Sequence, residues 1–198
     1  MSAPAALTAR ERSLLLRLAR AAVDAAVRGE PPPLPRAFAA AADTELSGPL
    51  LERRGAFVSL HRRGRLRGCI GDIAGTAPLC EAVIANALAA AFRDPRFLPL
   101  TADELPGLTL EISALSPLRA VADWTAIEVP RHGVVMACGS ARAVFLPQVA
   151  AEQGWDRETL LDQLSLKAGL DAGAWRRGAR FHIFEAEVFG EEPSRDWA

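Results

Sequence analysis

The chain has 198 residues, of which 50% are hydrophobic and 24% are charged, a composition typical of roughly one or two globular domains that excludes a wholly disordered or fibrous protein. Lysine and arginine together number 23, and aspartate and glutamate number 24, so the net charge is −1. Because the chain has no basic surplus, we expect no nucleic-acid partner and no attraction to an acidic membrane.

The three cysteines, Cys69, Cys80 and Cys138, include no C-x-x-C pair. They predict neither a disulfide framework nor a thiolate zinc site, and we expect Cys80 and Cys138 to be core residues. Charged residues at 10–12 stand where a signal peptide needs an apolar core, and the longest apolar run, 82–92, is too short to span a bilayer. We therefore expect a cytoplasmic protein with no membrane segment. The three scattered histidines signal no metal motif.

The first predicted element is a helix over 9–28. Thr8 and Glu11 have the spacing of a capping box, and apolar residues then recur at helical intervals. The prolines at 31–35 lack amide donors, so an extended connector is expected there. A short helix is expected over 46–53.

Segments 55–61 and 66–72 have strand composition and are separated by a short polar turn, which predicts an antiparallel hairpin. Thr76 stands where it would cap the following helix, which we expect to end at Phe92. A second capping-box pattern follows at 101–104.

The rest of the chain mixes short apolar runs with helical segments. Strands are expected over 108–115, 127–129, 134–138, 143–146 and 180–189. Helices are expected over 148–153 and 157–168, the second with Asp156 as its N-cap. Antiparallel strands beside segregated helices favour an α+β fold over a doubly wound parallel sheet.

The most unusual local sequence is Leu-Arg-Gly-Cys-Ile-Gly at 66–71, in which two glycines flank a thiol. Gly68 and Gly71 weaken a strand, so they indicate a place where another backbone or a ligand comes close. The functional interpretation is that Cys69 is a reactive thiol. The alternative is that Cys69 is a small buried hydrophobe.

The hairpin register predicts the surroundings of this thiol. Pairing outward from the turn places Cys69 opposite Val58, with Arg67 on the same face as the thiol. His61 then falls on the other face unless a bulge intervenes. In this register Arg67 would favour the thiolate.

Other polar candidates lie further along the chain. Asp94 and Arg96 belong to the turn Asp-Pro-Arg-Phe at 94–97, and the alternative to a ligand-binding role is structural, since an aspartate in a turn accepts nearby backbone amides. Glu111 stands in an otherwise apolar strand. If it faces inward, it needs a partner and becomes a candidate acid or base.

At 66–71 the sequence resembles the AMMECR domain family, whose bacterial members are called AmmeMemoRadiSam system protein A. The resemblance runs from the first helix to about Glu191. Further similar segments, in the family's order, are 94–97, 110–117, 146–149, 154–155 and 167–170.

The resemblance implies a two-part α+β domain with a cleft between its parts. The larger part gathers both chain ends, and the change in sequence character places it at about 1–120 and 179–198. The smaller, inserted part is then about 121–178. Members often carry a cysteine where Ser165 stands here, so a disulfide partner for Cys69 at that position is not expected.

Two functions remain open. In the first, the chain is an enzyme in which Cys69 acts as nucleophile or acid/base, Arg67 binds a carboxylate or phosphate, and glycine amides supply an anion site. The candidate substrate-binding residues are Arg67, Gly68, Gly71, Asp94, Arg96 and Glu111. In the second, it is a non-catalytic binding or adaptor module, and the glycines let a partner's backbone approach.

The family resemblance also implies partners, namely a Memo-type protein and a radical S-adenosylmethionine enzyme. The sequence itself names neither a substrate nor a cofactor.

Overall fold

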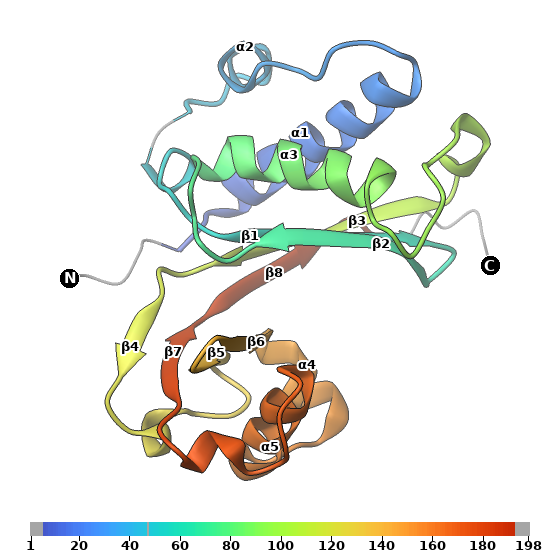
Figure 1. Cartoon of the computed structure of the whole chain (residues 1–198). Coiled ribbons are helices and arrows are strands. Elements are labelled where there is room, and N and C mark those ends of the chain that lie inside the picture. The colour runs from blue at the N-terminus through green and yellow to red at the C-terminus, as the bar shows by residue number, and fades with distance from the viewer. Residues whose placement is uncertain (1–5, 47, 193–198) are drawn as a thin grey trace. The chain divides into compact units, whose positions relative to one another are not determined.

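The chain forms two units in the computed structural model, which describes residues 6–46 and 48–192 (Figure 1). The first unit comprises Met1–Leu115 and Glu187–Ala198, and the second comprises Ser116–Ala186. Within the described ranges, no helix is long and apolar enough to cross a membrane.

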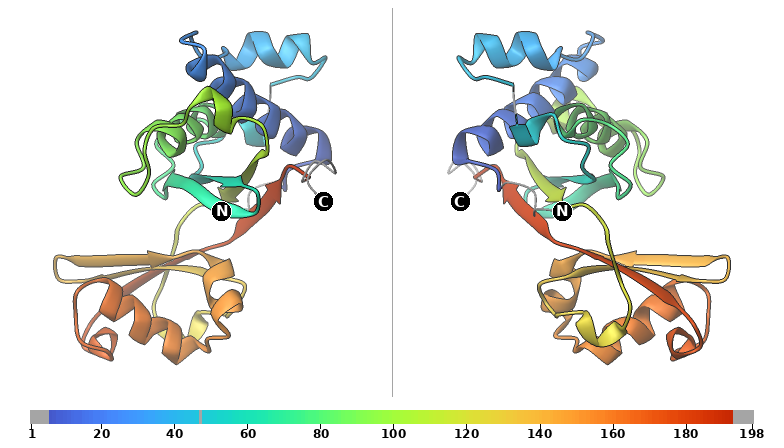
Figure 2. Two further views of the ribbon diagram at one scale, coloured as in Figure 1. Left: turned by 90° about the vertical axis from the view of Figure 1, so that its right-hand side faces the viewer. Right: turned by 90° about the vertical axis from the view of Figure 1, so that its left-hand side faces the viewer.

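The first unit is a four-stranded sheet with two long helices on one face. Its helices are α1 (Ala9–Val27), α2 (Pro35–Ala41) and α3 (Leu79–Phe92), with short 3-10 turns at Gly48–Leu50 and Ala102–Glu104. Its strands are β1 (Ala56–Arg62), β2 (Arg65–Asp72), β3 (Leu108–Leu115) and β8 (Ala186–Gly190), in the spatial order β2-β1-β3-β8. Both views in Figure 2 show α1 and α3 on the same side of this sheet.

Helix α1 begins at the predicted cap. The Thr8 hydroxyl accepts the amide of Glu11, whose carboxylate accepts the amide of Thr8, so two amide groups that the helix leaves unpaired are satisfied. The chain leaves the helix at Gly29, which has φ of +73°, a conformation that glycine adopts without steric cost. The predicted helix is confirmed.

The core of the first unit lies between the sheet and these two helices. Its central residues include Leu15, Leu18, Val58, Leu60, Val83, Ala87, Leu110 and Ile112. Because side chains alternate along a strand, the residues between the core positions point to the opposite side of the sheet. We call that side the helix-free face, and define it by Phe57, Ser59, His61, Cys69, Thr109 and Glu111.

Helix α3 starts later than predicted. It begins at Leu79 behind Pro78, without a side-chain cap, so the predicted cap by Thr76 is wrong. The Thr76 hydroxyl instead donates to the Asp72 carboxylate (3.4 Å).

The short helix near residue 46 is predicted at the wrong position. Helix α2 begins at Pro35, since the first position of a helix needs no amide donor. The helix predicted over 46–53 is wrong and is replaced by the 3-10 turn at Gly48–Leu50; Ser47 lies outside the described residues.

The second unit is another four-stranded sheet packed against helices. Its strands are β4 (Arg119–Val121), β5 (Gly133–Cys138), β6 (Ala141–Phe145) and β7 (Arg180–Phe184), in the order β4-β7-β5-β6. Its helices are α4 (Pro147–Gln153) and α5 (Arg157–Lys167), with 3-10 turns at Trp124–Ala126 and Ala174–Arg176. The unit is longer than the predicted segment 121–178 because the strands β4 and β7 join its sheet.

Two strand predictions differ from the structure. The predicted strand 127–129 is absent from the described fold, and the segment expected as one strand over 180–189 forms β7 and β8, which belong to different sheets. The break lies at Glu185, which exchanges two hydrogen bonds with Ser116. With helices segregated from two largely antiparallel sheets, the predicted α+β class is confirmed.

Ser165 belongs to the core of the second unit. It is fully buried; its hydroxyl donates to the Leu161 carbonyl (3.1 Å) and accepts the Trp175 amide (3.3 Å).

Candidate functional site

The thiol of Cys69 lies on strand β2, at the edge of the first sheet, opposite Ser59. The predicted pairing with Val58 is wrong because the register shifts by one residue in this hairpin, where Arg67 is the additional residue of a bulge. The shift brings His61 to the same face as Cys69, although the unbulged register predicts the opposite face.

Three polar side chains form a row across neighbouring strands of the helix-free face. Ser59 on β1 pairs with Cys69 on β2 and with Glu111 on β3. The Ser59 hydroxyl donates to the Cys69 sulfur at 3.2 Å, and all three side chains are half-buried. Because directly opposed residues in a sheet lie side by side, a thiol, a hydroxyl and a carboxylate are neighbours here. We call Cys69, Ser59 and Glu111 the thiol row.

The backbone of Cys69 is held from outside the sheet by Asp94 and Arg96. Asp94 accepts the Cys69 amide at 2.9 Å, and Arg96 donates to the Cys69 carbonyl at 3.3 Å. The two side chains also form a bidentate ion pair, with N–O distances of 3.0 and 2.7 Å. They thereby replace the hydrogen bonds that a further strand would supply to this edge.

The Asp94 carboxylate is buried, with 1% of its side chain exposed. Hydrogen bonds from Arg96 and from the Cys69 amide hold the pKa of Asp94 well below its usual range, although burial opposes this shift. Asp94 and Arg96 are therefore engaged within the protein, in agreement with the structural alternative for the turn 94–97.

Arg67 is also engaged. Its guanidinium donates to both carboxylate oxygens of Glu104, at 2.7 and 2.8 Å, and to the Leu98 carbonyl at 2.9 Å. The positive charge predicted to act on the thiol or on an anionic ligand is thus neutralised by a carboxylate. Sequence reasoning identified Glu104 only as part of a capping box, since nothing local signals its pairing with a residue 37 positions away.

The flanking glycines accommodate close approaches inside the unit. A Cβ at Gly68 would lie 2.2 Å from the carbonyl oxygen of Ala90 in α3, on the core side of the sheet. A Cβ at Gly71 would lie 2.2 Å from the ring of Phe57. The backbone predicted to come close is therefore that of α3, and both glycines have a packing role.

Acid should weaken the Arg67–Glu104 pair. Hydrogen bonds from Arg67 and from the Thr101 amide lower the pKa of Glu104 to about 2. A carboxyl group with a lowered pKa binds fewer protons folded than unfolded, so its stabilisation is complete above the unfolded value of about 4.3 and is lost as the pH falls toward 2.

Glu104→Gln removes the negative charge but leaves an oxygen that can accept the Thr101 amide. We expect this variant to lower the free energy of unfolding at pH 7 by about 1–2 kcal/mol. We also expect the free energy of unfolding to depend less on pH below about 4. Urea denaturation at several pH values measures both effects. The control is Glu158→Gln, which removes an exposed ion pair with Arg176 and should change little. Equal effects of the two substitutions would contradict the prediction.

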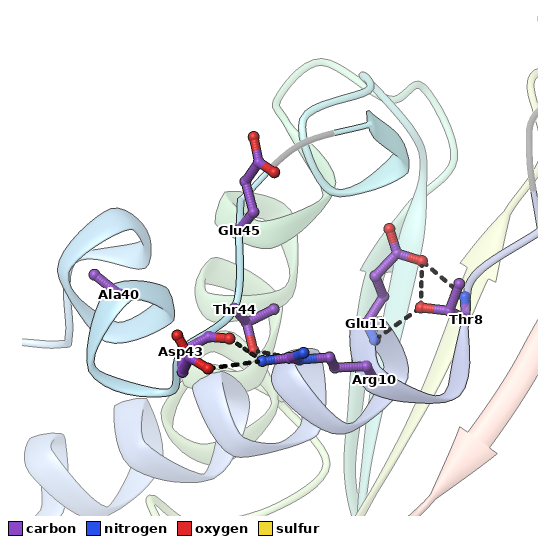
Figure 3. Close-up of a pocket in the computed structure, with 7 residues that line it drawn as sticks. All are labelled: Thr8, Arg10, Glu11, Ala40, Asp43, Thr44 and Glu45. Carbon is purple, nitrogen blue, oxygen red and sulfur yellow. Dashed lines mark hydrogen bonds and ion pairs between the residues drawn. The ribbon is translucent and has the colours of Figure 1, made fainter.

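A pocket elsewhere in the first unit does not involve the thiol row. It has a volume of about 590 Å³ and is lined by Thr8, Arg10, Glu11, Ala40, Asp43, Thr44 and Glu45 (Figure 3). Several of its polar groups bond to one another: Arg10 donates to the Thr44 hydroxyl and to the Asp43 carbonyl, and Thr8 and Glu11 form the cap of α1. Among the described residues, no group of three or more His, Cys, Asp or Glu is arranged to hold a metal ion.

Known proteins are similar to this chain in sequence and in structure. A sequence model of the AMMECR1 family matches residues 16–189. A protein of Methanosarcina acetivorans is 36% identical over 193 residues, covering 94% of each chain. A protein of Thermofilum pendens is 39% identical over 207 residues, covering 93% of this chain and 92% of its own. Among solved structures, uncharacterized protein PH0010 from Pyrococcus horikoshii is similar with a TM-score of 0.78 and 35% identity, covering 91% of each chain.

Proposed function

The chain belongs to the AMMECR1 family, and from this premise we propose that the thiol row is its functional site, with Cys69 as a nucleophile toward an electrophilic ligand. The observation that carries the proposal is the 3.2 Å contact between the Ser59 hydroxyl and the Cys69 sulfur, in the same cross-strand row as Glu111. An activated nucleophile usually contacts a group that a third group orients, and the cross-strand pairing places a hydroxyl and then a carboxylate in that order beside the thiol.

The row offers a route for the thiol proton when the Ser59 hydroxyl, which donates to the Cys69 sulfur in the structure, turns toward the neighbouring Glu111 carboxylate. The Cys69 S–H then donates its proton to the Ser59 oxygen while the Ser59 proton passes to the Glu111 carboxylate. The sulfur keeps its electron pair as a thiolate, which is the nucleophilic form of cysteine. The Ser59 hydroxyl then donates to that thiolate.

The position of the thiol supports the same role. Asp94 and Arg96 hold the amide and the carbonyl of Cys69, so the sulfur is carried on a backbone that is fixed at the strand edge. A nucleophile held in place loses little conformational freedom when it reacts. Arg67 receives no ligand-binding role in this proposal because Glu104 already pairs with it.

The rate of alkylation by iodoacetamide, followed by mass spectrometry from pH 6 to 9, tests the proposal. We expect Cys69 to react about tenfold faster than Cys138 at pH 7. Both thiols are half-buried, but Cys69 belongs to the thiol row and Cys138 does not. Ser59→Ala and Glu111→Gln should each remove most of this difference. Thr109→Ala, on the same face but outside the row, is the control and should leave the rate unchanged.

Equal rates for Cys69 and Cys138 would refute the proposal that Cys69 is an activated nucleophile. A Cys69 rate that is unchanged in Glu111→Gln would refute it as well. A second candidate would then be favoured, in which the same face is a non-catalytic binding or adaptor module. The observation supporting it is the neutralisation of Arg67 by Glu104, which removes the charge expected for an anionic substrate.

The family resemblance supports a Memo-type protein and a radical S-adenosylmethionine enzyme as partners, and we propose this association for either candidate function. The Cys69→Ser variant separates the candidates when pull-down of these proteins and the cellular phenotype are both measured. An adaptor keeps the association and the phenotype, whereas an enzyme keeps the association and loses the phenotype together with any turnover that depends on Cys69.

A further inference from the structure

A strongly basic surface lies at the tip of the β1–β2 hairpin and on the loop that follows α3. The two segments, 61–67 and 93–104, touch: Arg67 donates to the Leu98 carbonyl at 2.9 Å, and Arg62 donates to the Asp103 carbonyl at 3.2 Å. Together they contain six arginines and three acidic residues, a net charge of +3 in a chain whose total is −1. We call this surface the basic tip.

The acidic residues of the basic tip are all used internally. Asp94 pairs with Arg96, and Glu104 pairs with Arg67 and lies 3.5 Å from Arg62. Asp103 accepts the Thr101 hydroxyl at 2.6 Å.

Arginine donors remain in excess at the basic tip. Arg65 and Arg93 are exposed and have no ion-pair partner within the described ranges. Two further N–H groups, Nε of Arg62 and Nη1 of Arg67, are buried without an acceptor. A surface with unpaired guanidinium groups and a net positive charge attracts a negatively charged partner.

Two leucines stand among these arginines. Leu66 is 43% exposed beside Arg65, and Leu98 is 83% exposed although its carbonyl is held by Arg67. The loop is therefore fixed while the Leu98 side chain points outward. Apolar groups inside a charged rim are typical of a protein-binding surface.

We propose that the basic tip docks an acidic segment of a partner protein. Carboxylates of that segment pair with Arg65 and Arg93, and an apolar side chain packs on Leu66 and Leu98. A protein fits better than nucleic acid, whose phosphates would gain nothing from the leucines. The contacts involve side chains, because the Cys69 amide and carbonyl at the adjacent strand edge are already bonded to Asp94 and Arg96.

The test uses the full chain and a fluorescein-labelled peptide of repeating Glu-Glu-Leu, with fluorescence anisotropy in 50 and 300 mM NaCl. We expect binding that weakens with salt, that falls by about tenfold in the Arg65→Glu/Arg93→Glu variant, and that falls severalfold in Leu98→Ser. Arg142→Glu, an exposed change on β6 in the second unit, is the matched control and should bind normally.

Absence of peptide binding by the unaltered chain would overturn the proposal, as would an equal loss in Arg142→Glu. Binding that survives Leu98→Ser unchanged would also refute it, since charge alone would then suffice. Preferential binding of single-stranded DNA or of phosphatidylserine vesicles, with the same dependence on Arg65 and Arg93, would assign the surface to another class of partner. None of these outcomes depends on the reactivity of Cys69.

Discussion

Replacing Gly68 with alanine is expected to lower the free energy of unfolding by about 3 kcal/mol, because strand β2 passes so close to α3 that no side chain fits between them. The new Cβ would lie 2.2 Å from the carbonyl oxygen of Ala90 and 3.0 Å from its carbonyl carbon. Both are backbone atoms of a helix whose neighbours are buried, so neither moves without separating α3 from the sheet.

Urea denaturation followed by circular dichroism measures the loss. Gly190→Ala is the matched control, since it is also a strand glycine of the first unit and its Cβ would lie 3.2 Å from the nearest atom, the Leu110 carbonyl oxygen. We expect this control to cost much less. If the two variants were equally stable, the close packing of α3 on β2 would be refuted.

The second large effect is expected at Asp94. Asp94→Asn should lower the free energy of unfolding at pH 7 by about 2 kcal/mol, because the variant loses a buried carboxylate that accepts hydrogen bonds from Arg96 and from the Cys69 amide. The figure is below that of a fully buried ion pair because 54% of the Arg96 side chain is exposed.

Asp94 should also contribute to the loss of folding stability at acidic pH. The pKa of Asp94 is lower in the folded than in the unfolded protein, so its stabilisation is present above the unfolded value of about 3.9 and is lost as the pH falls below it. Asp94→Asn should therefore lose less stability between pH 5 and pH 2 than the unaltered chain. Asp171→Asn serves as the control because that side chain is exposed and makes no hydrogen bond or ion pair with the described residues. A variant as acid-sensitive as the unaltered chain would show that Asp94 does not carry this effect.

Some features of the candidate site are predictable from the sequence and others are not. The close approaches at the glycines of 66–71 are predictable, because a glycine weakens a strand and so indicates a place where another backbone or a ligand comes close. The neighbours of the thiol are not. Arg67 forms a bulge that shifts the pairing of the two strands by one position. Ser59 therefore lies opposite Cys69 in place of Val58. His61 lies on the same face as Cys69, because a shift of one position exchanges the two faces of a strand.

Partnerships between distant residues are the other feature that the sequence leaves open. Asp94 and Cys69 are 25 residues apart, and Arg67 and Glu104 are 37 apart. Each of these residues has a plausible local role, in a turn, a strand or a helix cap. Only the folded chain shows that Arg67, predicted to bind a ligand, pairs with Glu104, and that Asp94 binds the Cys69 amide.

By itself, the sequence determined the α+β class, the capping box of α1, the β1–β2 hairpin and the existence of β3, because these depend on hydrogen bonds and side-chain periodicity within a few neighbouring residues. The tertiary structure alone decided the hairpin register, the division of the segment 180–189 between two sheets and the pairing of Arg67 with Glu104. These features depend on which surfaces meet when the sheet and helices pack, and that choice is made by contacts between residues far apart in the chain.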